Sequence, residues 1–176
     1  MLSAKFGYRY LPGIVADGDF REGLKHWQVQ GRAEAVSFDG LGKMQRRYDI
    51  LDAAGDSGAM LAPATRLSQK LSNLETDKAY VFTCLATDYD ALLQNHAEPL
   101  ELQLAVSVNG TETIPGKSFQ YVDDRKKVHR TQEGKARWNY IRVVFRANIP
   151  EAELMLTNKD GKPLFVNTIA VNPYFE

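Results

Sequence analysis

The amino-acid sequence predicts an all-β domain in which antiparallel strands form a sandwich or a barrel. Short segments rich in Val, Ile, Phe and Tyr recur along the chain, and Gly, Asn, Asp or other polar residues separate them. Apolar and polar residues alternate within several of these segments. Strands do not alternate with long helical segments, as they would in a parallel α/β sheet. The best helical pattern, at residues 89–97, predicts one or two turns in a loop.

The expected strands are spread over the chain from Trp27 onward. They are the segments 27–30, 32–38, 59–62, 65–71, 79–87, 100–109, 118–122, 137–147, 152–157 and 163–171. Two of the intervening segments, Asn109-Gly110 and residues 159–162, carry turn-forming residues and predict hairpins.

Alternation assigns faces to two of these strands, because successive side chains of a strand point to opposite sides. In residues 100–109 the core face is expected to hold Leu102, Leu104, Val106 and Val108, and the outer face Glu101, Gln103, Ala105, Ser107 and Asn109. In residues 137–147 the core face is expected to hold Ile141, Val143 and Phe145, and the opposite face Trp138, Tyr140, Arg142, Val144 and Arg146. Aromatic and guanidinium groups together on an outer face indicate a binding surface.

Length and charge narrow the class of protein. The 176 residues suit one domain, and the 22 basic and 22 acidic residues give zero formal charge. This balance argues against nucleic-acid binding and against electrostatic docking to a membrane. No apolar run approaches the roughly 20 residues of a membrane helix, and residues 1–13 lack the continuous apolar core of a signal peptide.

The single cysteine, Cys84, lies in an apolar strand segment and cannot form an intramolecular disulfide. We expect a buried, unreactive thiol on the same side as Tyr80 and Phe82, since a free cysteine behaves as a small hydrophobe.

Residues typical of catalysis do not form a recognisable pattern. The three histidines are scattered, and the sequence contains no metalloprotease, esterase, phosphate-loop or dinucleotide motif. The acidic pairs Asp88/Asp90 and Asp123/Asp124 fall in expected loops, where paired aspartates are typical of turns. An independent enzyme is therefore the least favoured class.

Several segments, taken in order, resemble carbohydrate-binding modules of the galactose-binding-like jelly-roll type. The opening stretch supplies Asp17, Gly18, Phe20, Gly23, Leu24, Trp27 and Gly31, and the next block Gln69, Leu74, Tyr80 and Phe82. Residues 137–147 resemble the late Trp-bearing strand of that family, and residues 164–171 its closing strand. The resemblance implies a two-sheet jelly roll over residues 13–176, with residues 1–12 as a linker or N-terminal extension. It also implies that Phe20, Leu24 and Trp27 anchor the first strands to the core.

The family often carries a structural calcium ion, held by an acidic residue after the opening Phe and by an Asp in the last strand. This sequence has Arg21 at the first position and Asn167-Thr168 at the second. A cation at Arg21 opposes a divalent ion, so we expect no calcium, no other metal and no cofactor. Arg21 is expected to tether the last strand by hydrogen bonds, and Asp17-Gly18-Asp19 to form a turn.

The resemblance implies a non-catalytic module that binds an oligo- or polysaccharide as an appendage of a glycan-active enzyme, with an upstream catalytic domain as partner. It also implies an extracytoplasmic location. The alternative is a structural accessory domain of a larger glycoside hydrolase without a ligand of its own. Sugar sites combine aromatic platforms with planar hydrogen-bonding groups. If their strands are neighbours, the expected site residues are Trp138, Tyr140, Arg142, Gln103 and Glu101.

Overall fold

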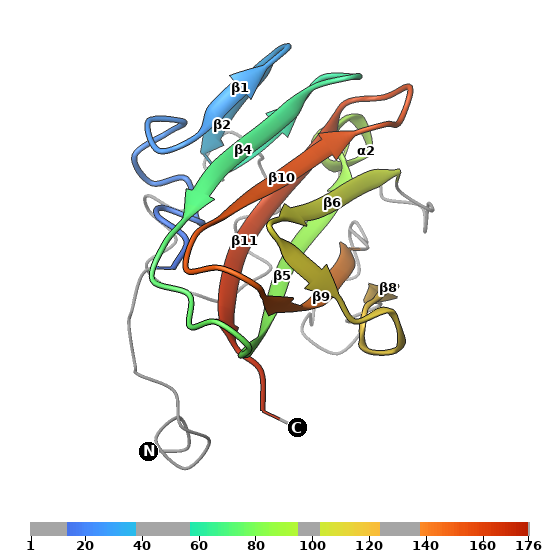
Figure 1. Cartoon of the computed structure of the whole chain (residues 1–176). Coiled ribbons are helices and arrows are strands. Elements are labelled where there is room, and N and C mark those ends of the chain that lie inside the picture. Colours follow the sequence, from blue (N-terminus) through green and yellow to red (C-terminus); the bar gives the residue numbers. More distant parts are fainter. Residues whose placement is uncertain (1–13, 38–56, 95–102, 124–137, 176) are drawn as a thin grey trace, which may run out of the picture.

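The structure, a computed structural model, describes residues 14–37, 57–94, 103–123 and 138–175, with residues 121–123 and 138 described by their backbone alone. Two antiparallel sheets pack face to face, and the four-stranded sheet lies in front in Figure 1. The predicted two-sheet sandwich is confirmed. The expected segment 1–12 and Glu101 lie outside the described residues.

The four-stranded sheet draws its strands from distant parts of the chain. Its order is β1 (Gln28–Gln30), β4 (Arg66–Leu71), β10 (Ala152–Asn158) and β6 (Leu104–Asn109). All three neighbouring pairs are antiparallel. The outer face of this sheet is therefore assembled from four separate segments.

The seven-stranded sheet lies behind it. Its order is β2 (Ala33–Ser37), β3 (Ser57–Leu61), β11 (Leu164–Pro173), β5 (Ala79–Asp88), β9 (Trp138–Ala147) and β7 (Thr111–Thr113), and β8 (Phe119–Asp123) also pairs with β9. The short helix α2 (Tyr89–Leu93) follows β5 as expected, and a 3-10 turn, η2 (Pro115–Lys117), precedes β8.

Two predicted hairpins are wrong. Asn109-Gly110 does form a tight turn, with Gly110 at φ +83°, but β6 before it and β7 after it belong to different sheets. Residues 159–162 likewise connect β10 of the four-stranded sheet to β11 of the seven-stranded sheet. Turn chemistry is the same in a hairpin and in a connection between sheets, so the turn residues alone did not distinguish them.

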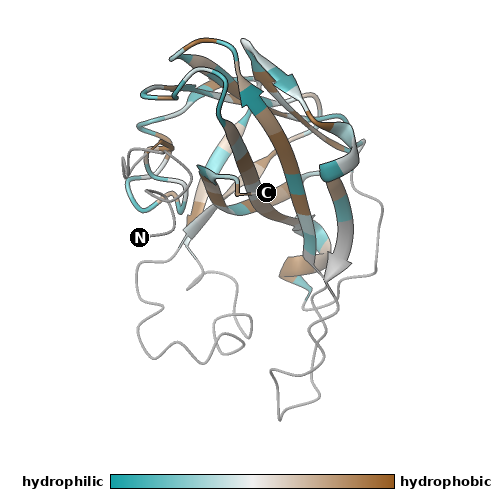
Figure 2. Cartoon of the chain, turned by 60° about the horizontal axis from the view of Figure 1, so that its bottom comes forward, coloured by the Kyte–Doolittle hydropathy of each residue, from teal (hydrophilic) through white to brown (hydrophobic). Residues whose placement is uncertain are grey.

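The core lies between the two sheets, and the strands show bands of brown and teal in Figure 2. The predicted alternation holds for most core positions, but Val144, expected on the outer face, is fully buried outside this core cluster. Leu104 and Val108 of β6 and Ile141 and Phe145 of β9 are buried in it. Val143 is half-buried and packs against the same cluster. Among the described residues, no helix has the length and apolar character needed to cross a membrane.

Cys84 is buried beside Tyr80 and Phe82 in this core, as predicted. Burial alone raises the pKa of its thiol well above the usual range, since nothing there compensates a thiolate for lost water. We expect a thiol reagent to label the native protein at the rate of unfolding, with fast labelling only in denaturant. Rapid labelling of the native protein would contradict this burial.

The opening segment is anchored as the sequence predicts. The rings of Phe20 and Trp27 stack with centroids 5.4 Å apart, both are buried, and Leu24 packs against the same core. Asp17 turns the chain, because its carboxylate accepts the backbone N–H groups of residues 21 and 22. A Cβ at Gly18 would lie 1.9 Å from the carbonyl oxygen of Ile169, so the turn packs directly on β11.

Candidate functional site

The outer face of the four-stranded sheet carries polar side chains in register. Strand alternation turns Leu67, Leu71, Leu154 and Leu156 into the core. The alternate residues Ser68, Lys70, Glu153 and Met155 therefore lie on the opposite face, whereas Gln69 shares the inward face. Antiparallel pairing then sets the outward residues of different strands side by side.

Three rows of outward residues cross the sheet. The backbone pairing places Ser68 between Gln28 and Met155, with Ser107 beyond Met155. The next row holds Lys70, Glu153 and Asn109, and the row on the other side holds Gln30, Arg66, Thr157 and Ala105. Amide, hydroxyl and carboxylate groups therefore lie together on this face of the sheet, with Ser68 buried between its neighbours.

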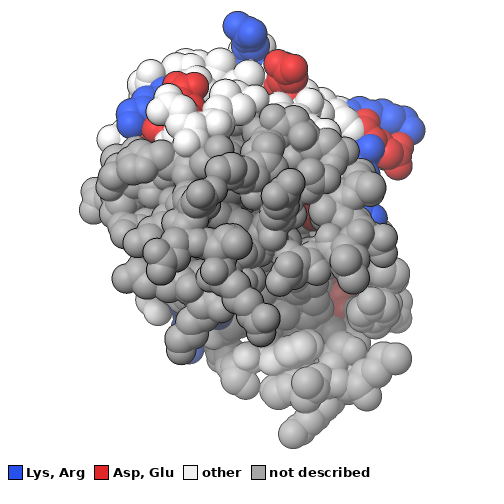
Figure 3. All heavy atoms as spheres, turned by 180° about the vertical axis from the view of Figure 1, so that it is seen from behind, with Lys and Arg blue, Asp and Glu red and all other residues white. Residues whose placement is uncertain are grey.

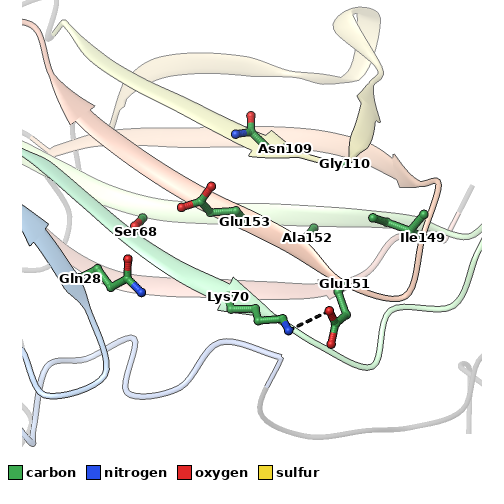
Figure 4. A pocket seen from close by; sticks show the side chains of 9 residues that line it. All are labelled: Gln28, Ser68, Lys70, Asn109, Gly110, Ile149, Glu151, Ala152 and Glu153. Carbon is green, nitrogen blue, oxygen red and sulfur yellow. Dashed lines mark ion pairs between the residues drawn. The ribbon is translucent and has the colours of Figure 1, made fainter.

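A shallow groove of about 460 Å³ runs over this surface (Figure 4). It is lined by Gln28, Ser68, Lys70, Asn109, Gly110, Ile149, Glu151, Ala152 and Glu153. Figure 4 shows Glu153 near the middle, with Asn109 on one side and Gln28 and Ser68 on the other. The groove therefore presents both donors and acceptors to a long, narrow ligand.

One end of the groove is apolar. Ile149 is 50% exposed and lies against Gly110, where a Cβ added to the glycine would come within 3.3 Å of the isoleucine side chain. The half-buried Met155 adds a second apolar surface near Asn109, whose amide nitrogen lies 3.9 Å from the methionine sulfur. No aromatic residue lines the groove within the part of the chain that the structure describes.

A second hollow of about 330 Å³ continues the groove past β4 and shares Gln28, Ser68 and Lys70 with it. Beneath this hollow Gln69 is buried, and its amide joins the opening segment to the sheet. Its oxygen accepts the N–H of Ala16 at 2.7 Å, and its nitrogen donates to the carbonyls of Ala16 and His26 at 2.9 and 3.0 Å. The opening turn is thus one wall of the extended groove.

The predicted site residues are split between the two sheets. Gln103 is exposed, and its carbonyl accepts the N–H of Lys159 just before β6, at the edge of the four-stranded sheet. Tyr140 and Arg142 lie on β9 in the seven-stranded sheet. The condition that the two strands are neighbours is therefore not met, because β6 and β9 belong to different sheets, whose outer faces point away from each other.

Trp138 is the first residue of β9, where its backbone pairs with Asp123, and its side chain is outside the described part. Tyr140 is half-buried, with its ring 6.4 Å from that of Phe119. The sequence thus placed Trp138 and Tyr140 on the correct strand, but it grouped them in one site with Gln103, which lies at the four-stranded sheet.

Arg142 is held between two aromatic rings. Its guanidinium carbon lies 5.2 Å from the ring centre of Phe119 and 5.1 Å from that of Tyr174. Such cation–π contacts stabilise a desolvated guanidinium. Its Nε is buried without a hydrogen-bond partner among the described residues. This arrangement ties β8 and the end of the chain to β9 and leaves Arg142 committed to packing.

The positions expected to replace calcium ligands have other partners. Asn167 donates from Nδ2 to the carbonyl of Ser57 at 2.6 Å, and its Oδ1 accepts from the hydroxyl of Thr168. The described ranges contain no group of three or more His, Cys, Asp or Glu placed to hold a metal ion. The absence of calcium and the Arg21 tether stay predictions.

Charged groups of both signs are mixed where described side chains are visible in Figure 3, which views the molecule from behind. On the groove face the same mixing is local, since the Nζ of Lys70 lies 2.7 Å from the Oε2 of Glu151. Both side chains are more than half exposed, so this ion pair contributes little to stability. The ion pair does, however, engage the ammonium group of Lys70 next to the groove.

Comparison with known proteins adds to this geometry. No protein-family model matches the sequence, and no curated protein matches it significantly. Among solved structures, the chain is similar to one described as Family 16 Carbohydrate Binding Module-2, at 17% identity and a TM-score of 0.54, covering 90% of this chain and 99% of that one. The chain therefore shares the jelly-roll fold of that module.

The same fold occurs inside a much longer protein. The chain is similar to the enzymatically active domain of bacteriophage CBA120 tailspike protein 4, at 10% identity and a TM-score of 0.54. The match covers 91% of this chain and 21% of that one. The chain therefore spans about a fifth of that protein, and this likeness concerns the fold.

The sequence alone could identify only some of the groove residues. The alternation in residues 65–71 and 152–157 marks Ser68, Lys70 and Glu153 as outward, just as it marked Asn109. The sequence did not reveal the order of the strands in the sheet. β4 and β10 are adjacent there, although their paired residues Arg66 and Thr157 are 91 residues apart in the chain.

Proposed function

We propose that this domain is a non-catalytic carbohydrate-binding module that binds a saccharide chain in the groove on the four-stranded sheet. The observation that carries the proposal is the pair of neighbouring rows that set Gln28 and Ser68 beside Glu153 and Asn109 along an open groove. Sugar hydroxyls both donate and accept hydrogen bonds, which these groups match. The apolar C–H faces of a sugar fit against Ile149 and Met155.

The jelly-roll fold supports the same function, because it is shared with a protein described as a carbohydrate-binding module. Attachment to a glycan-active enzyme, with a catalytic domain in the parent chain, is the context that we propose for it. The second candidate, an accessory domain without a ligand, is favoured by the absence of an aromatic platform among the described groove residues.

A second surface for a saccharide is the face of β9 that carries Trp138, Tyr140 and Arg142. We favour the groove over this face for a physical reason. Arg142 is clamped between Phe119 and Tyr174, and pulling its guanidinium toward a sugar would sacrifice both contacts. The groove, by contrast, keeps its amides at an open surface.

The test begins with a glycan array to find a saccharide that binds, followed by titration calorimetry on variants. Gln28→Ala and Asn109→Ala are each expected to weaken binding about two- to tenfold, because each removes one or two hydrogen bonds to hydroxyls. The double variant is expected to weaken binding more than either single one, with little change in the unfolding temperature.

Asn172→Ala is the matched control, because Asn172 is an exposed asparagine on β11 of the other sheet. It is expected to bind with wild-type affinity. Equal loss in Asn109→Ala and Asn172→Ala, or no loss in either, would place the sugar elsewhere. If no saccharide on the array bound, the accessory-domain function would be favoured.

A further inference from the structure

The charges that line the groove do not cancel. Glu151 and Glu153 contribute two carboxylates, and Lys70 contributes one ammonium group. That ammonium is 2.7 Å from the Oε2 of Glu151, on the side away from the middle of the groove (Figure 4). Glu153 is exposed near the middle, and its backbone partners across the sheet are Lys70 and Asn109. Among the groove residues that the structure describes, one carboxylate is therefore in excess where a ligand would lie.

Neighbouring charged groups among the described residues do not remove this excess. Arg66 lies on the same face, but it is four residues along β4 from Lys70, about 13 Å at strand spacing. That exceeds the screening length of about 8 Å at physiological salt. The Nε of Arg66 also lies 3.4 Å from the hydroxyl of Thr157. The charge of Arg66 thus lies in the row of Thr157, away from Glu153.

The described lining of the second hollow adds no lysine or arginine beyond the shared Lys70. Its histidine, His26, lies with Nε2 3.3 Å from Glu22, and the ammonium of Lys25 lies 2.7 Å from the same carboxylate oxygen. These hydrogen bonds and charges, that of Lys25 first, lower the pKa of Glu22. The charges of this cluster are therefore satisfied locally, at the outer side of the hollow.

We propose that the groove prefers a glycan whose sugars carry protonated amines, such as a chain of glucosamine units. This inference rests on the proposed saccharide binding and names its substrate class. A protonated amine donates charge-assisted hydrogen bonds to Glu153, while its neighbouring hydroxyls bond to Asn109 and Gln28. A uronic acid would bring a carboxylate beside Glu153 and be repelled.

The experiment compares three hexasaccharides by calorimetry at a mildly acidic pH, at which glucosamine is protonated. They are a glucosamine hexamer, its fully N-acetylated counterpart with the same backbone, and a galacturonic acid hexamer. The glucosamine hexamer is expected to bind about two- to fivefold tighter than the acetylated one, the size typical of one exposed charge pair. The preference is expected to shrink as salt is added, and the uronic hexamer to bind weakest.

Glu153→Gln is expected to abolish the preference, so that the glucosamine hexamer and its acetylated counterpart bind with equal affinity. Glu112→Gln on β7 removes the same charge from an exposed residue of the other sheet and is expected to keep the preference. Equal or weaker binding of the glucosamine hexamer, or a preference that survives Glu153→Gln, would overturn the inference. If Asn109→Ala still weakened neutral glycan binding, the proposed function would stand without it.

Discussion

Replacing Trp27 with alanine is expected to lower the free energy of unfolding by roughly 3–5 kcal/mol, the range seen for large-to-small changes of aromatic core residues. Trp27 is 6% exposed, and its ring stacks on Phe20. Its Nε1 also donates to the carbonyl of Asp17 at 3.3 Å, so the change would loosen the opening turn as well. Urea denaturation followed by circular dichroism measures this loss.

Trp138→Ala is the matched comparison, since it makes the same truncation at the other tryptophan of the chain. Alternation in β9 places Trp138 on the face opposite to the core residues Ile141 and Phe145. We therefore expect Trp138→Ala to lower the free energy of unfolding less than Trp27→Ala does. A loss equal to that of Trp27→Ala would show that Trp138 is a core residue. Its role as a stacking platform for sugar would then be excluded.

Replacing Asn158 with alanine is expected to destabilise the domain by about 3 kcal/mol or more, because several buried groups would lose their partners together. The side chain is fully buried, and its Nδ2 donates to the carbonyls of Leu61, Ala62 and Lys162 at 3.0, 3.2 and 2.8 Å. Its Oδ1 accepts the N–H of Asp160 at 2.8 Å. One amide thus joins the end of β3 to the connection between β10 and β11.

Asn158→Asp sharpens the same test, because it keeps the shape but turns an oxygen toward three carbonyl groups. It is expected to be at least as destabilising as alanine at neutral pH. Asn172→Ala at an exposed position is the control and is expected to change the free energy of unfolding by less than about 0.5 kcal/mol. A loss below about 1 kcal/mol for both Asn158 variants would contradict the buried network.

The strands were predictable from the sequence because each contains its own periodic pattern. Tyr80, Phe82 and Cys84 alternate with more exposed residues, and this local rule holds whichever strands lie beside β5. The three-residue strand β7 was missed, since Thr111–Thr113 carries no apolar face of its own. Its pairing with the end of β9 makes it a strand.

The site was less predictable, because it depends on which strands are neighbours. Gln103 lies just before β6 and Arg142 lies on β9, so both fall in segments that were predicted as strands, yet β6 and β9 belong to different sheets. Nothing local to residues 100–109 or 137–147 encodes that partition. The groove brings Gln28, Ser68 and Asn109 together only after β10 has paired with both β4 and β6.

The most direct test of saccharide binding on the four-stranded sheet is a map of backbone amide chemical shifts during titration with a glycan that binds. Binding in the groove predicts that the largest changes fall on Gln28, Ser68, Lys70, Asn109 and Glu153, and that amides of the outer face of the other sheet hardly move. Changes centred on β8, β9 and Tyr174, with the groove unaffected, would contradict it.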